Sequence, residues 1–187
     1  MEKSIHINED IRLIQQRARP RQVQAFLHLL KTNEKRIKPY FPGFYTDGLS
    51  FELVQEMLQN KEKGYKEQKI TSYAICSRKR KKIIGEFLIH HTLIDANISY
   101  WIDSSCAREG IISLVFDTVR EKLFADKVHA IYACCNKKNK PSIRFLKKKG
   151  LKQLAEYKNQ KGKPFIDFGQ TRQEYLFLNR IKLQNER

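Results

Sequence analysis

At Gly110 the apolar pattern of this sequence changes from the alternation of a β-strand to the spacing of an amphipathic helix. Residues 98–102 predict the strand, and a turn from Ser105 to Gly110 follows it. The helix is predicted to end near Ala125, with one apolar face formed by Ile111, Leu114, Val115, Thr118, Val119 and Leu123. A helix start leaves backbone N–H groups unpaired, and the helix dipole favours negative charge there. This segment is therefore suited to holding a diphosphate.

Strand and helix signals also follow one another along the rest of the chain. Alternating residues at 70–77 and 83–91 flank a polar turn at 78–82, which predicts an antiparallel hairpin. Ser50 is the expected N-cap of a helix. The other expected elements are a strand near 11–14, a helix after Pro20, a strand at 128–135, a short helix from Pro141 to Gly150, and closing strands at 151–157 and 174–178.

Size and composition favour one soluble domain. The sequence has 187 residues, of which 41% are hydrophobic and 30% are charged, which suits a packed core and argues against a membrane protein. Charged residues interrupt every apolar window near the N-terminus, so we expect a cytoplasmic location, no signal peptide and no membrane partner. The cysteines have neither disulfide nor zinc spacing, so we expect no metal and interpret them as small core residues: Cys76, Cys106, Cys134 and Cys135.

The chain carries a strong positive charge. Its net charge is +17, from 37 Lys and Arg against 20 Asp and Glu, and such a field attracts polyanions of every kind. The basic clusters at 78–82, 137–140 and 147–149 are short, and no nucleic-acid recognition motif accompanies them. The charge is therefore equally consistent with a solvated surface and with contact to RNA or the ribosome.

A second segment strengthens the interpretation of the turn before Gly110. A strand ends at Cys135-Asn136, and a polar loop with Asn139 and Ser142 leads into a short helix and the pair Gly150-Leu151. Together with the strand at 98–102, this order resembles the GNAT superfamily of acetyl-CoA-dependent acetyltransferases.

The similarity is most specific to the ribosomal-protein (Rim-type) N-terminal acetyltransferase branch of that superfamily. The segments 11–13 and 38–42 also look like this branch, so the resemblance extends over nearly the whole chain. It implies an α/β (α+β) fold in a single GNAT-like domain, with a central mixed, mostly antiparallel sheet flanked by helices on both faces. We place that domain at residues 8–180 and a C-terminal tail at 181–187.

The resemblance also implies a cofactor site for acetyl-CoA. It assigns the backbone amides near Ile102 and Asp103 to the pantetheine arm. Asn139 matches the family asparagine that meets this arm, and the hydroxyl of Ser142 matches the group that faces the thiolate leaving group. The pyrophosphate would lie in the loop formed by Arg108, Glu109, Gly110, Ile111 and Ile112.

Two positions depart from the family pattern. The signature Gln/Arg-x-x-Gly-x-Gly is here Ser105-Cys106-Ala107-Arg108-Glu109-Gly110, so Arg108 replaces the first glycine. Its side chain either blocks close approach of phosphate or grips the phosphate through the guanidinium. Leu146 lies where many relatives carry a general-acid tyrosine, which leaves that role to Ser142 or to a water.

Acetyl transfer to an amine needs a base, because an amine is mostly protonated at neutral pH. Glu86 on the strand before the pocket is the first candidate. His90 lies two pleats further along the same face and is the second, whereas His91 points to the opposite face. The rival interpretation for each is a solvent-facing or locally paired polar residue.

The function expected from these features is N-acetylation of a primary amine by acetyl-CoA, with a protein N-terminus of the ribosomal-protein type as acceptor. One alternative is acetylation of a small-molecule amine. Another is a catalytically degenerate GNAT-fold protein that binds RNA or the ribosome through its basic surface. A strongly positive enzyme repels basic acceptors unless the slot is acidic, for which Glu52, Glu56 and Glu86 are the candidates.

Overall fold

The computed structural model describes residues 2–41, 45 and 48–185, with side chains described as far as residue 179. The predicted turn at 38–42 therefore lies partly outside the described residues. The chain forms two compact units. The N-terminal unit comprises Met1–His91 and Ser99–Val119, and the C-terminal unit comprises Thr92–Ile98 and Arg120–Arg187.

One mixed sheet carries the strands of both units. The strand order is β1-β2-β3-β4-β5-β6-β8-β7. The pairs β1–β2, β2–β3, β3–β4, β6–β8 and β7–β8 are antiparallel, and the pair β5–β6 is parallel. The strands are β1 (Ser4–His6), β2 (Ile11–Gln15), β3 (Ile70–Ser77), β4 (Lys82–His91), β5 (Ala96–Ile102), β6 (Ala130–Asn136), β7 (Lys152–Lys158) and β8 (Pro164–Thr171). This mixed, mostly antiparallel sheet confirms the predicted fold class.

The helices also follow the predicted order for most of the chain. They are α1 (Pro20–Thr32), α2 (Glu34–Ile37), α3 (Phe51–Lys66), the 3₁₀ turn η2 (Ser104–Cys106), α4 (Ile111–Ala125), α5 (Lys140–Lys148) and α6 (Arg172–Asn185). A parallel strand pair needs a long crossover connection, and α4 supplies it between β5 and β6. No helix in the described part of the chain is long and apolar enough to cross a membrane.

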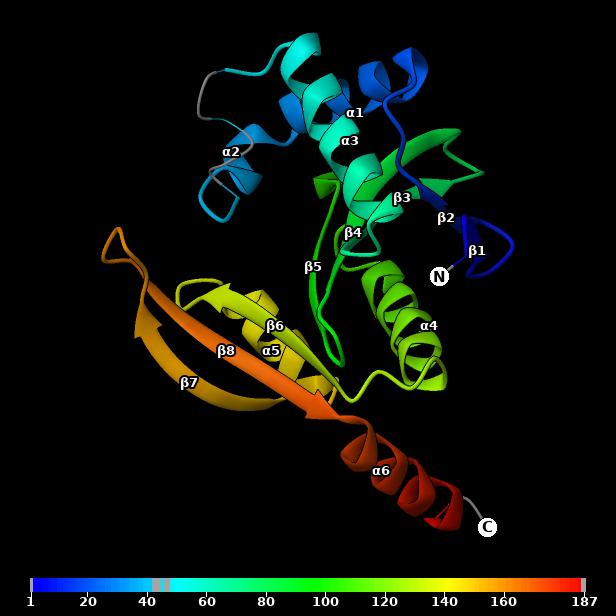
Figure 1. Ribbon diagram of the computed structural model, residues 1–187, viewed down its shortest axis with the longest axis vertical. Coiled ribbons are helices and arrows are strands. Elements are labelled where there is room, and N and C mark those ends of the chain that lie inside the picture. The colour runs from blue at the N-terminus through cyan, green and yellow to red at the C-terminus, as the bar shows by residue number, and fades with distance from the viewer. Residues whose placement is uncertain (1, 42–44, 46–47, 186–187) are drawn as a thin grey trace. The chain divides into compact units, whose positions relative to one another are not determined.

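In the N-terminal unit, α1 and α3 lie next to one another (Figure 1, blue and cyan) and contact β4 and β3 respectively. Their apolar faces form a buried cluster that includes Phe26, Leu30, Val54, Leu58 and Trp101. The Ser50 hydroxyl caps α3 by accepting a hydrogen bond from the amide of residue 53 at 3.1 Å, as predicted. The two helices thereby cover one part of the sheet.

The β3–β4 hairpin has a tightly held turn. The carboxylate of Asp10 accepts hydrogen bonds from the Ser77 hydroxyl at 2.9 Å and from the Lys79 amide at 2.7 Å. These bonds also lower the pKa of Asp10, with the backbone amide of Lys79 as the main cause. The predicted basic turn at 78–82 is therefore a fixed element of the N-terminal unit.

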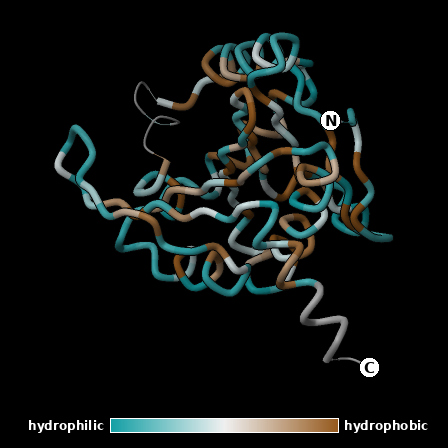
Figure 2. Tube along the Cα trace, turned by 60° about the horizontal axis from the view of Figure 1, so that its bottom comes forward, coloured by the Kyte–Doolittle hydropathy of each residue, from teal (hydrophilic) through white to brown (hydrophobic). Residues whose placement is uncertain are grey.

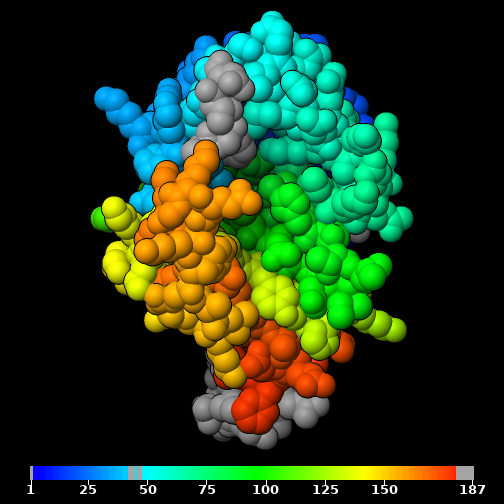
Figure 3. Space-filling model, turned by 60° about the vertical axis from the view of Figure 1, so that its left-hand side comes forward, coloured from blue at the N-terminus to red at the C-terminus, as the bar shows by residue number. Residues whose placement is uncertain are grey.

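In the C-terminal unit, the start of β5 pairs with β6, and β8 pairs with β6 and β7. All residues of β7 are exposed, and the strand lies at the surface in Figure 3 (orange). Hydrophilic residues form the turn that joins it to β8, as Figure 2 shows.

The structure corrects the predicted burial of one cysteine. Cys106 and Cys135 are buried and Cys76 is partly buried, but Cys134 is exposed. Successive residues of a strand point to opposite faces, so Cys134 and Cys135 cannot both face the core. The Cys134 sulfur instead lies 3.1 Å from the Tyr157 hydroxyl.

The structure also corrects the last predicted strand. Residues 174–178 belong to α6, and the strand that pairs with β7 is β8. The cause is a capping box. The Thr171 amide donates to the Glu174 carboxylate at 2.8 Å, and the Glu174 amide donates to the Thr171 hydroxyl at 3.2 Å.

Helix α6 also runs across residues 180 and 181, where we expected the domain to end and a tail to begin. The limits 8–180 and 181–187 stay a prediction.

Candidate active site

The end of β5 fixes the first group of predicted cofactor residues. Ile102 and Asp103 are buried. The Asp103 amide donates to the Ile84 carbonyl at 2.6 Å, which commits that amide to the sheet. Its carboxylate accepts hydrogen bonds from the Ser105 amide at 3.1 Å and from Lys82 Nζ at 2.9 Å. Burial alone would raise the pKa of Asp103, but the bonds from Lys82 and Ser105 hold it below its usual value.

The turn before α4 keeps a left-handed backbone at both positions where the family has glycine. Arg108 has φ +69° and Gly110 has φ +78°. A Cβ at Gly110 would meet no atom within 4 Å. Glycine is therefore favoured at this position by the positive φ angle and not by a lack of space for a side chain. The first N–H groups of α4, including those of Ile111 and Ile112, have no acceptor within the helix. The donors in this loop fit a diphosphate.

Glu109 does not leave an uncompensated negative charge in this loop. Arg80 from the β3–β4 turn donates to both of its carboxylate oxygens, at 2.8 and 3.1 Å. Both side chains are partly exposed, and the contact with Glu109 raises the pKa of Arg80. The turn at 78–82 is thus joined to the loop by this pair and by Lys82–Asp103.

Glu86, the first candidate base, lies in a buried polar network. Its side chain is 2% exposed and forms an ion pair with Lys61 of α3. One carboxylate oxygen also accepts from Ser72 Oγ at 3.0 Å, and the other accepts from Trp101 Nε1 at 3.2 Å. Gln16 joins the network through Ser72 and Lys61. Glu86 is therefore a buried carboxylate with hydrogen-bond donors at both of its oxygens.

The two neighbouring histidines have different surroundings. His90 is exposed. Nearby protein atoms and the charge of Lys61 lower its pKa, whereas Glu86 opposes this shift. His91 lies on the other face of β4, where its Nε2 is 2.9 Å from the Thr71 hydroxyl. The lowered pKa favours the neutral form of His90.

The C-terminal unit holds the second group of predicted residues. Asn139 is the N-cap of α5, and its side chain accepts from the Ser142 amide at 3.3 Å. The Ser142 hydroxyl interacts with Cys135. Burial raises the pKa of Cys135, and the contact with Ser142 reduces this shift. Leu146 is 1% exposed. Asn139 and Ser142 thus contact one another in the C-terminal unit, and the other predicted residues, Glu86, His90, Ile102, Asp103 and 108–112, lie in the N-terminal unit.

Three residues in contact with these groups were missed from the sequence. Asn33 is buried at the end of α1, and its side-chain oxygen accepts from the Ser104 amide at 2.9 Å. Lys61 and Arg80 hold Glu86 and Glu109. Only Lys61 leaves a signal in the sequence, because it lies on the same helical face as Val54 and Leu58.

Comparison with known protein families identifies the fold. The model of the acetyltransferase (GNAT) domain matches residues 12–152 of the chain. The chain belongs to this family. GNAT proteins use acetyl-CoA as acetyl donor, so this chain is an acetyl-CoA-dependent acetyltransferase by family. A comparison with curated protein sequences found no match.

Solved structures of other GNAT proteins share the fold at low sequence identity. RimL, a ribosomal L7/L12 α-N-protein acetyltransferase in complex with coenzyme A, is 16% identical with a TM-score of 0.78, covering 90% of this chain and 97% of RimL. The ribosomal-protein-S5-alanine acetyltransferase from Vibrio fischeri is 16% identical with a TM-score of 0.78, and the match covers 91% of this chain and 97% of that protein. The microcin C7 self-immunity acetyltransferase MccE, in complex with acetyl-CoA and AMP, is 15% identical with a TM-score of 0.78, and the match covers 91% of this chain and 97% of MccE.

Proposed function

We propose that this GNAT protein is an N-acetyltransferase that acts on a primary amine, in the first place the α-amine of a protein N-terminus. The observation that carries the proposal is the loop before α4, which keeps left-handed φ angles at Arg108 and Gly110 although one glycine is missing. The fold shared with ribosomal-protein acetyltransferases supports the choice of acceptor. A cytoplasmic location is part of the same proposal.

The cofactor-binding residues divide by the part of the cofactor that they would hold. We assign the pyrophosphate to Arg108, Glu109, Gly110, Ile111 and Ile112, with the guanidinium of Arg108 as a phosphate partner. Arg80 supports this loop by neutralising Glu109.

The pantetheine arm is assigned to the backbone at Ile102 and Asp103 and to Asn139. Because the Asp103 amide is bonded to Ile84, Ile102 and Asn139 are the main partners in this assignment.

The chain's own residues would supply the proton transfers. Acetyl-CoA, when bound, supplies the acetyl group as a thioester. Glu86 is our first candidate to take the proton that the attacking amine loses, and His90 is the second. Lys61 holds the Glu86 carboxylate, so an acceptor ammonium would compete with Lys61 for the same oxygens. Ser142 would donate a proton toward the leaving sulfur, because Leu146 has no ionisable group.

A pair of variants tests the base. Glu86→Gln should lower kcat/KM by about 100-fold or more, while acetyl-CoA binding measured by calorimetry stays within twofold of the wild type. The double variant Lys61→Met with Glu86→Gln controls for the loss of the ion pair between Lys61 and residue 86 in the single variant. His91→Gln is the matched control on the opposite face of β4 and should retain the wild-type rate.

The outcomes separate the two candidate bases and the two acceptor classes. Retained activity in Glu86→Gln together with loss in His90→Gln would assign the base to His90. Mass spectrometry of peptides, polyamines and aminoglycosides after incubation with acetyl-CoA identifies the acceptor. Acetylation of the small amines in place of peptide N-termini would support the small-molecule alternative.

A further inference from the structure

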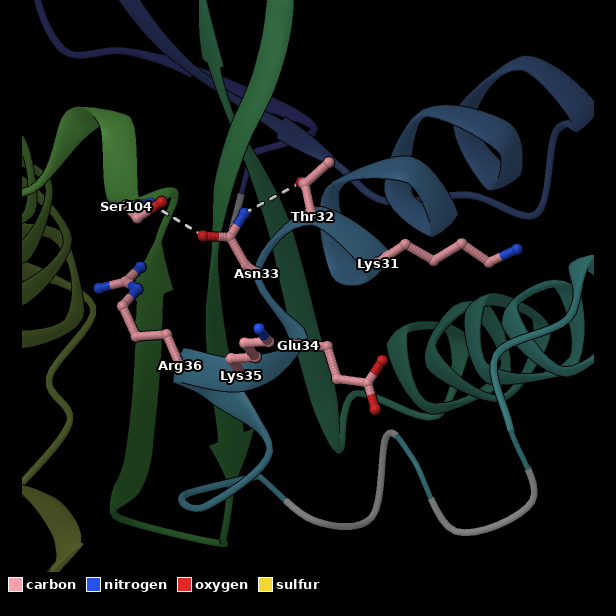
Figure 4. Close-up of a pocket in the computed structure, with 7 residues that line it drawn as sticks. All are labelled: Lys31, Thr32, Asn33, Glu34, Lys35, Arg36 and Ser104. Atoms are coloured by element: carbon pink, nitrogen blue, oxygen red, sulfur yellow. Dashed lines mark hydrogen bonds between the residues drawn. The ribbon is translucent and has the colours of Figure 1, made fainter.

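A basic pocket of about 360 Å³ lies in the N-terminal unit, where α1 ends and α2 begins. This volume falls within the usual range of about 300–1,000 Å³ for ligand sites. The pocket is lined by Lys31, Thr32, Asn33, Glu34, Lys35, Arg36 and Ser104. Figure 4 shows Arg36 on the same side as Ser104, with Lys31 pointing to the opposite side and Lys35 between them.

The three cations of this pocket, Lys31, Lys35 and Arg36, have no ion-pair partner among the described residues, and only the more distant charge of Asp103 acts on one of them, Arg36. The one acid of the lining, Glu34, is paired with Lys38 at 3.0 Å. Lys35 and Arg36 are adjacent cations that repel one another, so an anion placed beside them would relieve this repulsion as well as form new contacts.

The pocket adjoins the strand end that the cofactor assignment uses. Asn33 joins the pocket to Ser104, the residue after Asp103, through the bond of 2.9 Å shown in Figure 4. Surrounding protein lowers the pKa of Arg36, and the charge of Asp103 opposes this shift. Arg36 is thus an exposed cation near the end of β5, and its planar group matches a carboxylate.

We propose that this pocket binds carboxylate side chains of the acceptor, so that the enzyme prefers peptides with Asp or Glu just after the N-terminal residue. The inference rests on the proposed function and names the acceptor class for the same site. Arg36 and Lys35 donate hydrogen bonds to the carboxylates, and Lys31 adds long-range attraction.

The acids expected to attract a basic acceptor do not form an opposing site. Glu52 and Glu56 are exposed on α3, and Lys61 neutralises Glu86. A basic peptide would therefore meet uncompensated positive charge near the end of β5, on a protein whose net charge is already +17. Charge complementarity of this kind governs specificity and association rate more than total affinity.

Three matched peptides test the inference by binding and by turnover. Each begins with serine and differs only at its second and third residues, which are both Glu, both Gln or both Lys. A fluorophore at the C-terminus reports binding by anisotropy, with and without coenzyme A. We expect the Glu peptide to bind about tenfold tighter than the Gln peptide and the Lys peptide to bind weakest.

Charge reversal assigns the preference to the pocket. The double variant Lys35→Glu with Arg36→Glu should abolish the preference for the Glu peptide, and the neutral pair Lys35→Ala with Arg36→Ala should reduce it. The control is Lys161→Glu with Lys163→Glu, which makes the same change in net charge on the β7–β8 turn. This control should keep the wild-type order of the three peptides.

Each contrary result overturns the inference in a different way. Equal binding of the three peptides, or loss of the preference in the Lys161 and Lys163 control, would show that the pocket does not select the acceptor. Weaker acetyl-CoA binding with unchanged peptide binding in the reversal variant would assign the pocket to a cofactor phosphate. Tighter binding of phosphoethanolamine than of the Glu peptide would assign it to a small anionic amine.

The same measurements keep the inference separate from the proposed function. Equal acetylation of the Glu, Gln and Lys peptides would support the proposed function and contradict the proposed role of the pocket. Tight binding of the Glu peptide without any acetyl transfer would support the proposed role of the pocket and contradict the proposed function.

Discussion

Arg108 has a strained backbone conformation in the proposed cofactor loop. A non-glycine residue with φ +69° is in the left-handed region, where the Cβ lies too close to the following carbonyl oxygen. The loop adopts this angle nonetheless, so its backbone conformation is kept at a cost in stability. Strain of this kind is often found where a backbone serves a ligand.

Replacing Arg108 by glycine should remove that strain. We expect Arg108→Gly to raise the free energy of unfolding by about 1 kcal/mol, measured by urea denaturation. Arg108→Ala is the control, because alanine keeps the strained Cβ and loses only the guanidinium. Equal stability of the two variants would contradict the strain, and weaker acetyl-CoA binding by both would identify the guanidinium as a phosphate ligand.

Asp103 makes a pH-dependent contribution at the end of β5. Its pKa is lowered in the folded protein, so the stabilisation is fully present above about pH 3.9, the ordinary value of an aspartate, and is lost as pH falls through the lowered pKa. Lys82→Met removes one of the hydrogen bonds that lower the pKa.

Acid unfolding of Lys82→Met, followed by circular dichroism, should therefore begin at higher pH than in the wild type. Lys82→Arg keeps a cationic donor and should unfold as the wild type does. An unchanged midpoint in Lys82→Met would mean that the Lys82–Asp103 pair does not contribute.

At the scale of secondary-structure elements, Asn33 joins the end of α1 to the turn after β5. The side-chain amide of buried Asn33 donates to the Leu29 carbonyl at 3.0 Å, and its oxygen accepts from the Ser104 amide at 2.9 Å in a partly buried contact. Asn33→Ala leaves the Ser104 amide without this acceptor and should cost about 1–3 kcal/mol of stability.

Thr32→Ala removes the exposed hydroxyl that bonds Asn33 and the Leu29 carbonyl but keeps the acceptor of the Ser104 amide, and it should cost less than Asn33→Ala. Denaturant unfolding measures both values. A similar small effect in the two variants would show that water satisfies the Ser104 amide in place of Asn33.

The sequence was informative wherever the apolar pattern is local. The period change at Gly110 predicted β5 and α4, and the alternation around 78–82 predicted the β3–β4 hairpin. The error at 174–178 has a local cause too, because the Thr171 and Glu174 capping box starts a helix that the apolar run did not indicate. The exposed Leu176, Phe177 and Leu178 look in sequence like a strand core.

The candidate site was less predictable, because its contacts join distant parts of the chain. The sequence singled out Glu86 and Glu109. It gave no sign of the pair between Arg80 and Glu109, and for Lys61 it showed only that this residue shares a helical face with Val54 and Leu58. Such pairs depend on how α3 and the 78–82 turn pack, which no local pattern contains. The basic pocket was missed for the same reason, since Arg36 and Ser104 lie far apart in sequence.

At the scale of the whole molecule, the positive charge and the family assignment point to anionic partners. A net charge of +17 increases the encounter rate with acidic ligands and decreases it with basic ones. Acetyl-CoA carries phosphates, and the proposed acceptor carries carboxylates. The charge is thus consistent with both substrates of the proposed reaction without requiring RNA.

Thermal unfolding in increasing acetyl-CoA tests the central claim, that the Arg108 loop still binds the cofactor. Binding to the folded state alone should raise the melting temperature steadily with cofactor concentration. The free energy of unfolding rises by about 2.7 kcal/mol when the cofactor concentration is a hundred times the Kd. Acetyl-pantetheine, which lacks the phosphates, should give a smaller rise. An unchanged melting temperature at millimolar acetyl-CoA would contradict the account.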